Sequence, residues 1–149
     1  MSLQTTINSE LVTAMKAQDA VRLRGLRAIK AAILLANTAE NSKELDADSE
    51  IALLQRLVKQ RRDSLDIFTT QNRPDLAVRE EEEIAVIVEF LPKQLSREEV
   101  AAAVHTIVAE IGASSMKDMG RVMGAASKQL AGKTEGKLIS EIVKEVLSA

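Results

Sequence analysis

The chain has 149 residues, enough for one ordinary domain or two small ones, and 46% of them are hydrophobic. Its apolar residues are aliphatic, with two phenylalanines and neither tyrosine nor tryptophan, and this composition favours helices over sheets. The net charge of −2 excludes a general attraction of the whole molecule to nucleic acid or membrane, so a polyanion site must be a local patch. The absence of cysteine excludes disulfides, thiol chemistry and cysteine-ligated metals.

The first residues, MSLQTTINSELVTAMK, lack a basic region followed by an apolar run, so they do not resemble a secretory signal. No stretch approaches the roughly 20 apolar residues that span a bilayer. A chain without cysteine also suits a reducing compartment. We therefore expect a cytoplasmic protein that has no membrane segment.

Four amphipathic helices are expected in residues 1–91, the second over about 20–39 and the fourth over about 73–90. Asp19 is placed to cap the second helix, and Pro74 is tolerated in the first turn of the fourth. The apolar positions expected to face a core are Ile7, Leu11 and Met15 in the first helix, Leu26, Ile29 and Ile33 in the second, and Ile51, Leu54, Leu57, Val58, Leu65 and Phe68 in the third.

The clearest boundary in the chain lies in the segment LPKQLSREEV. Ser96 and Glu99 have the spacing of a capping box, which marks the start of a new helix. We therefore expect an N-terminal helical domain over residues 1–91, a linker over 92–95 and a C-terminal domain over 96–149.

The C-terminal domain is expected to be a bundle of three helices, which makes the whole chain an all-α protein in two parts. Gly112 should end the first of these helices, Ser115 and Asp118 mark the start of the second, and Thr134 should cap the third. The expected apolar stripes are Val100, Val104, Ile107, Val108 and Ile111 in the first helix and Leu138, Ile142 and Val146 in the last.

The segment MGRVMGAASKQLAGK, residues 119–133, has the apolar spacing of a helix yet contains three glycines. A glycine inside a helix costs about 1 kcal/mol relative to alanine. On a helical wheel, an expected core face is followed by a strip of small side chains and then by a basic edge. The core face holds Met116, Met119, Met123, Ala126 and Leu130, the small strip holds Gly120, Gly124, Ser127 and Ala131, and the basic edge holds Lys117, Arg121 and Lys128.

Two interpretations of this segment remain open. Small side chains let another backbone approach closely, and neighbouring cations offer charge and donors to phosphate oxygens, so an RNA backbone could meet the helix here. With Lys133 and Lys137 included, the stretch that begins at Lys117 holds five basic residues against Asp118 and Glu135. In the other interpretation, the small strip admits the last helix at close range and the cations are ordinary solvated residues.

Two further segments are rich in charged residues and could form binding patches. In RLVKQRRDSLD, Asp63 and Asp66 follow Lys59 and Arg62 by one turn, so ion pairs within the helix explain its charges. The second helix has bases that no nearby acid neutralises, which makes it a second candidate patch. These bases are Arg22, Arg24, Arg27 and Lys30.

The sequence contains no recognisable catalytic or metal-binding constellation. The acids from Glu80 to Glu83 lack the histidine partner that carboxylate metal sites in helical bundles use, so we interpret them as a solvated helix face. The single histidine, His105, lies off the apolar stripe of its helix. No P-loop, dinucleotide fingerprint, nucleophile elbow or kinase signature is present. We therefore expect no catalytic residue, no metal and no cofactor.

Several segments taken together resemble the YqeY family. They are IKAAILLA (29–36), LVKQRRDSLDIF (57–68), EFLPKQLSREEV (89–100), GASSMKDMGRVMGA (112–125) and GKTEGKLISEIVKEVL (132–147). The likeness extends over almost the whole chain, in order, and its most specific parts are LPKQLS and SSMKDMGRVMG. The family's G-x-V-M-G core matches Gly120, Val122, Met123 and Gly124, and its later G-K pair matches Gly136 and Lys137. Glu135 stands where the family has an aspartate.

The resemblance implies a two-part helical fold and contact with tRNA. YqeY proteins are similar to the C-terminal tail of GatB, a subunit of the amidotransferase that converts misacylated Glu-tRNA or Asp-tRNA to Gln-tRNA or Asn-tRNA. The catalytic portions of that enzyme lie outside the tail. A label of carbon–nitrogen ligase with glutamine as amido-nitrogen donor would therefore be inherited from the complex. The implied partners are tRNA and a tRNA-dependent amidotransferase or tRNA-synthetase complex.

We therefore expect a non-catalytic tRNA-binding module, or an accessory of a tRNA amidotransferase. The expected RNA-binding residues are Lys117, Gly120, Arg121, Gly124, Lys128, Lys133, Gly136 and Lys137. The alternative is an adaptor that docks a partner helix on the small, methionine-rich face and binds no nucleic acid.

Overall fold

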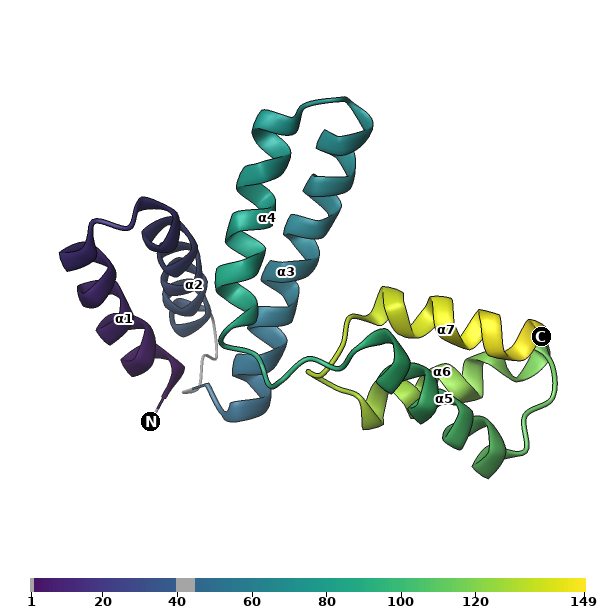
Figure 1. Cartoon of the computed structure of the whole chain (residues 1–149). Helices are drawn as coiled ribbons and strands as arrows, with labels where there is room; N and C mark the ends of the chain where they lie inside the picture. The colour runs from purple at the N-terminus through teal and green to yellow at the C-terminus, as the bar shows by residue number, and fades with distance from the viewer. Residues whose placement is uncertain (1, 40–44) are drawn as a thin grey trace. The chain divides into compact units, whose positions relative to one another are not determined.

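The computed structural model describes residues 2–39 and 45–149, and all regular secondary structure in these residues is helical. The prediction of an all-α protein is confirmed (Figure 1). The α-helices are α1 (Leu3–Ala17), α2 (Ala20–Thr38), α3 (Ala47–Thr70), α4 (Pro74–Val88), α5 (Arg97–Ile111), α6 (Met119–Gln129) and α7 (Gly136–Ser148). A single 3-10 turn, η1 (Met116–Asp118), precedes α6.

The chain consists of two compact units, Met1–Leu91 and Pro92–Ala149, called here the N-terminal and C-terminal units. Each unit has a hydrophobic core of its own. The buried core of the N-terminal unit is Ile7, Leu11, Ala14, Leu26, Ile29, Ile33, Leu54, Val58, Ile84, Val86 and Ile87. The buried core of the C-terminal unit is Val100, Val104, Ile107, Val122, Ala126, Leu130, Ile139, Ile142, Val143 and Leu147.

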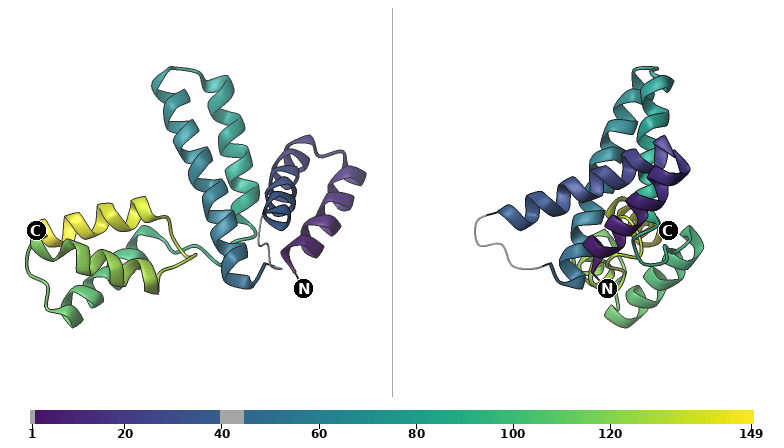
Figure 2. Two further views of the ribbon diagram at one scale, coloured as in Figure 1. Left: turned by 180° about the vertical axis from the view of Figure 1, so that it is seen from behind. Right: turned by 90° about the vertical axis from the view of Figure 1, so that its left-hand side faces the viewer.

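The N-terminal unit contains two helical hairpins, α1 with α2 and α3 with α4, and α2 packs against α4 (Figures 1 and 2). The Asp19 side chain accepts a hydrogen bond from the Arg22 backbone N–H, as predicted for the cap of α2. The prediction that Met15 faces the core is wrong, because its side chain is 51% exposed. Ala14 is buried in its place, one position earlier on the same helix.

The contact between α2 and α4 depends on a glycine. A Cβ atom built on Gly25 would lie 2.7 Å from Cβ of Val86 and 2.8 Å from its Cγ1. Real Cβ atoms essentially never approach other carbons so closely. Gly25 therefore lets the two helices approach each other, and this close packing offsets the cost of a glycine inside α2.

Ion pairs between helices account for much of the charge on the N-terminal unit. Arg22 lies 2.9 Å from Glu10 and 2.6 Å from Glu89, and hydrogen bonds to these two carboxylates raise the pKa of the guanidinium. Arg24 of the same helix lies 3.6 Å from Glu82. Two of the four bases predicted as a second patch are therefore already neutralised by acids from other helices.

The acids from Glu80 to Glu83 do not form a fully solvated face, and that prediction is wrong in this respect. The side chains of Glu83 and Arg61 are only 16% and 17% exposed and lie 4.0 Å apart. Burial, and the charge of Glu83, raise the pKa of Glu80. The run of acids in the middle of α4 thus faces arginines from α2 and α3 rather than water alone.

The start and end of α5 have the predicted geometry. The Ser96 side chain accepts from the Glu99 backbone N–H, and the Glu99 carboxylate accepts from the Ser96 N–H, which completes a capping box. These hydrogen bonds lower the pKa of Glu99. At the other end, Gly112 adopts a left-handed conformation with φ of 74° and accommodates the C-cap without steric strain.

Two details of the helices after α5 differ from the prediction. The helical wheel predicts Met116 on the core face, but its side chain is 45% exposed. Met116 belongs to the 3-10 turn, so the spacing of an α-helix does not extend back to it. Thr134 was assigned as the cap of α7, but it is buried, with 6% of its area exposed. Glu135 occupies the N-cap position instead.

The core face of α7 is also rotated slightly from the predicted one. Ile142 is buried as expected, whereas Leu138 and Val146 are only partly buried. Their neighbours Ile139 and Val143 complete the buried face. The predicted stripe is therefore on the correct side of α7, but Leu138 and Val146 lie at the edge of the buried face rather than at its centre.

We predict that Gly25→Ala destabilises the N-terminal unit by about 1–3 kcal/mol, the usual range for overpacking. The same substitution at an unobstructed helical position stabilises by about 0.5–1 kcal/mol, so the sign of the effect is diagnostic. Urea unfolding followed by far-UV circular dichroism measures it, since the chain has no tryptophan.

Because the obstructing atoms belong to Val86, adding Val86→Ala should recover part of the stability that Gly25→Ala removes. A double-mutant cycle measures this coupling. Strictly additive losses would contradict the assignment of the close approach to this pair.

Candidate nucleic-acid interface

The strip of small residues on α6 faces solvent. Gly120, Gly124, Ser127 and Ala131 are all exposed. A Cβ atom built on Gly120 or on Gly124 would meet nothing within 4 Å. These glycines therefore do not serve to bring α7 close, which was the alternative that the sequence left open for them. The helix instead exposes bare backbone.

The orientation of α6 follows from the residues that it buries. Val122 and Ala126 have no exposed area, and Leu130, just beyond the end of the helix, is 6% exposed. These side chains pack in the core with Ile139 and Val143 of α7. Because this side of α6 is fixed in the core, its glycine side must face outward.

The five predicted cations are all exposed and fall into two groups. Lys117 lies in η1, just before α6, and Arg121 lies in the first turn of α6, while Lys128 lies in its last turn. Lys133 follows in the turn after α6, and Lys137 lies in the first turn of α7. Since α6 has 11 residues, its length of about 16 Å separates the two groups.

Arg121 has protein partners as well as exposed area. Its Nη2 donates to the Ile111 carbonyl oxygen at 3.2 Å, and its Nη1 lies 3.5 Å from a carboxylate oxygen of Asp118. The other oxygen of Asp118 accepts from the Ser114 N–H at 3.0 Å. Arg121 thus ties the end of α5 to the start of α6, a structural role that the sequence did not indicate.

The start of α7 adds a second stretch of exposed backbone. Glu135 makes no side-chain hydrogen bond to cap the helix, and a Cβ built on the exposed Gly136 would meet nothing within 4 Å. The positive end of the helix dipole and the first N–H groups favour anions at such a terminus. Gly136 and Lys137 are thus exposed in the first turn of α7, which has Glu135 at its N-cap.

Lys93 is a further exposed cation near this surface, in the segment 92–95 that the sequence predicts only as a linker. The Gln94 side-chain amide donates to the Gly132 carbonyl oxygen, and the Leu95 N–H donates to the Lys133 carbonyl oxygen, both at 2.8 Å. Lys93 consequently lies beside the turn that joins α6 to α7. This contact could not be predicted from the spacing of residues in the sequence, because Gln94 and Gly132 are 38 residues apart.

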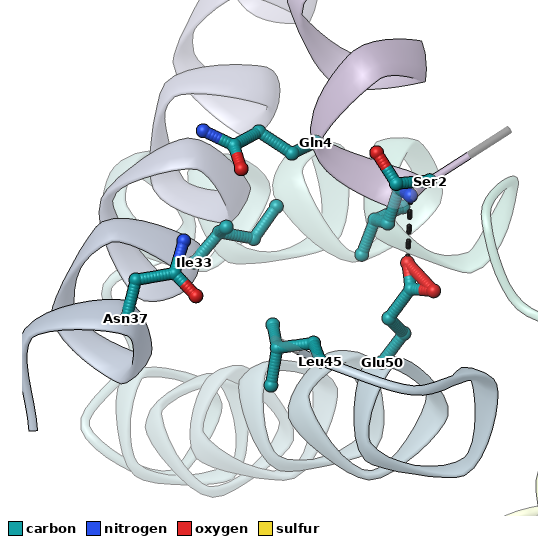
Figure 3. Close-up of a pocket in the computed structure, with 7 residues that line it drawn as sticks. Ser2, Gln4, Ile33, Asn37, Leu45 and Glu50 are labelled. Atoms are coloured by element: carbon teal, nitrogen blue, oxygen red, sulfur yellow. Dashed lines mark hydrogen bonds between the residues drawn. The ribbon is translucent and has the colours of Figure 1, made fainter. Parts of the chain in front are cut away.

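An open hollow of about 310 Å³ lies at the end of α3 and is lined by Asp66, Ile67, Thr70 and Gln71. A smaller cavity, of about 40 Å³, lies at the start of α1. There the Glu50 carboxylate accepts from the Leu3 N–H at 2.6 Å (Figure 3). Ligand pockets usually enclose several hundred Å³, so the cavity at the start of α1 is small for a ligand. Among residues 2–39 and 45–149, no three histidine, cysteine or carboxylate side chains are grouped to hold a metal ion. His105 is exposed on α5.

None of the helices in the described part of the chain is both long and apolar enough to cross a membrane. The chain is thus an all-helical protein of two compact units, with exposed lysines beside bare helix backbone on the second.

The model of the Yqey-like protein family matches residues 4–147. The chain therefore belongs to the YqeY family, and the resemblance seen in the sequence is confirmed. One curated relative is the protein named "Altered inheritance of mitochondria protein 41, mitochondrial" from Lachancea thermotolerans. It is 32% identical over 111 residues, which cover 73% of this chain and 59% of the relative. The chain thus spans about three fifths of the length of this relative.

Proposed function

We propose that this protein is a non-catalytic tRNA-binding module that binds through the exposed face of α6 and the start of α7. The observation that carries the proposal is the exposure of bare backbone at Gly120 and Gly124 beside exposed lysines. Phosphate oxygens accept hydrogen bonds from ammonium groups and can approach a helix closely where it has no side chain.

The separation of the cations supports binding to an extended polyanion rather than to one phosphate. Lys117 lies at one end of α6 and Lys128 and Lys133 lie at the other, so a ligand that contacts both groups must extend for about the length of the helix, roughly 16 Å. A nucleic-acid backbone carries charges at close, regular intervals over such a length.

Family membership supports an accessory role beside an enzyme that acts on tRNA. The family is similar to the tail of GatB, so we propose that the partner is a tRNA-dependent amidotransferase or a tRNA-synthetase complex. The ligase label of glutamine-dependent amidotransferases then describes the assembled enzyme, and this chain contributes contacts with tRNA.

We propose the cytoplasm as the site of action, in line with the sequence-based expectation. The curated relative has "mitochondrial" in its name, and a mitochondrial matrix is the alternative compartment. Charged tRNA is present in both, so the proposed activity does not depend on this choice.

A second candidate function is a protein adaptor that binds no RNA. The observation that favours it is the exposure of Met116, at 45%, one turn from the bare backbone at Gly120. Methionine is an adaptable contact residue, and a partner helix could pack on small residues beside it.

The proposed tRNA binding is expected to depend on the lysines near α6. One triple variant changes Lys117, Lys128 and Lys133 to glutamine, and the matched control changes the exposed Lys16, Arg56 and Arg79 of the N-terminal unit to glutamine. The first should weaken binding of unacylated tRNA at least tenfold and lower the slope of log affinity against log salt by about 2–3. Fluorescence anisotropy between about 50 and 200 mM salt measures both. Binding by the unmodified chain that is absent or insensitive to salt refutes the proposal.

A side chain at Gly124 is expected to obstruct RNA while it stabilises the protein. Gly124→Gln should raise the melting temperature, since glycine inside a helix costs about 1 kcal/mol and the site is open. The same variant should weaken tRNA binding about tenfold or more. Ala109→Gln, at an exposed position on α5, is the control and should leave affinity unchanged. A more stable Gly124→Gln that binds tRNA normally would contradict close approach of the RNA backbone.

The adaptor function makes a different prediction for the same face. A protein partner should then remain bound after ribonuclease treatment and be lost with Gly124→Leu, which fills the bare face with an apolar side chain. Co-purification with and without ribonuclease distinguishes the two functions. Loss of the partner on ribonuclease treatment would count against an adaptor and in favour of an RNA-mediated contact.

A further inference from the structure

The exposed side of α7 carries its charges in two rows of opposite sign. Glu141 and Glu145 lie 3.5 Å and 2.5 Å from Arg97 of α5, so the acidic row faces α5. Lys137 and Lys144 are exposed and lie about two turns apart on the same side of α7. This lysine row lies on the flank of α7 directed away from α5.

The two flanks of α6 also carry different kinds of residue. Arg121 reaches the carbonyl oxygen at the end of α5, so the flank that carries it faces α5. Gly120 and Ser127 lie on the opposite flank, which faces α7, because α5 and α7 are the two helices that pack against α6. The bare side of α6 and the lysine row of α7 therefore lie along the same outer surface.

The relative direction of the two helices brings Lys144 near the start of α6. A short turn joins α6 to α7, and the helices run in opposite directions (Figure 1). The η1 turn, which holds Lys117, packs against α7. Cations from both helices thus border the bare surface, and Lys144 adds positive charge at the end of α6 where Arg121 is already bound to protein groups.

The surface formed by α6 and α7 carries no aromatic side chain on which a base could stack. His105, the one aromatic side chain of the C-terminal unit, is exposed on α5 instead. Both phenylalanines, Phe68 and Phe90, belong to the N-terminal unit, where they are partly buried. The two arginines of the C-terminal unit, Arg97 and Arg121, are both held in ion pairs. Proteins that bind single-stranded RNA combine positive charge with stacking on aromatic or guanidinium planes. This surface supplies positive charge without a stacking platform.

We infer that the surface formed by α6 and α7 binds the sugar–phosphate backbone of double-helical RNA, and that Lys144 is one of its phosphate contacts. The inference rests on the proposed function and narrows its ligand from RNA in general to the paired arms of a folded RNA. A duplex holds its phosphates in fixed positions and offers 2′-hydroxyl groups in a wide, shallow groove, and neither contact requires base stacking. The hydroxyl group of Ser127, exposed on the bare side of α6, is suited to such a contact.

The test compares two RNA probes with the full chain. One is an RNA duplex of about 16 base pairs, and the other is a single strand of uridines with the same number of phosphates. Fluorescence anisotropy at about 0.1 M salt should show at least tenfold tighter binding of the duplex. Lys144→Gln should weaken duplex binding by about threefold to tenfold and lower the salt slope by about one. Lys16→Gln, an exposed lysine of the N-terminal unit, is the matched control and should leave both values unchanged.

Circular dichroism of Lys144→Gln should match that of the unmodified chain, since the side chain is exposed. Equal or tighter binding of the single strand overturns this inference but leaves RNA binding itself intact. An unchanged salt slope for Lys144→Gln overturns the assignment of Lys144. Failure of both probes and of tRNA to bind overturns the proposed function together with this inference.

Discussion

The burial of one side of α6 is the constraint on which the candidate site depends. Val122 and Ala126 are completely enclosed, and they lock the rotation of the helix about its own axis. A rotation that hid Gly124 would bring Val122 into water, and exposing a buried valine side chain costs about 1.5–3 kcal/mol. The exposed backbone is thus a consequence of core packing, and the orientation of the basic residues follows from the same contacts.

Charge is distributed differently in the two units, although the chain as a whole is nearly neutral. In the N-terminal unit, Arg22, Arg24 and Arg61 each lie near a carboxylate from another helix. In the C-terminal unit, the exposed cations are mostly lysines on or near two adjacent helices. Lysine is a compact, strongly hydrated point charge, whereas arginine is suited to partly buried ion pairs with carboxylates. The placement of the two residue types agrees with this difference.

The sequence predicted features that depend on local contacts. The capping box at Ser96, the left-handed Gly112 and the cap at Asp19 each involve residues within one turn of the chain, and all three are present. The prediction failed where regular helical spacing was extended too far, as at Met116 in the 3-10 turn. Contacts between distant segments, such as Gln94 with Gly132, leave no periodic signal in the sequence.

The sequence predicted which residues make up the candidate site, but not how they are packed or which contacts they make. The wheel placed the glycines beside a basic edge, yet its core face began at Met116 and omitted Val122, which has no exposed area. The sequence also gave no indication that Arg121 would bind the end of α5, since that contact depends on how the loop between the helices folds. The exposure of the small strip could be learned only from the packing of α6 against α5 and α7.

Gly25 and Gly124 both lie inside helices, but only Gly25 is required by the packing of the protein. At Gly25 a Cβ atom would collide with Val86, so the contact between α2 and α4 explains why a side chain is absent. At Gly124 nothing lies within 4 Å, and an alanine there would stabilise the helix by about 0.5–1 kcal/mol. No contact within the protein compensates for that lost stability. The close approach of an RNA backbone, which the proposed function requires at this face, would supply the missing reason.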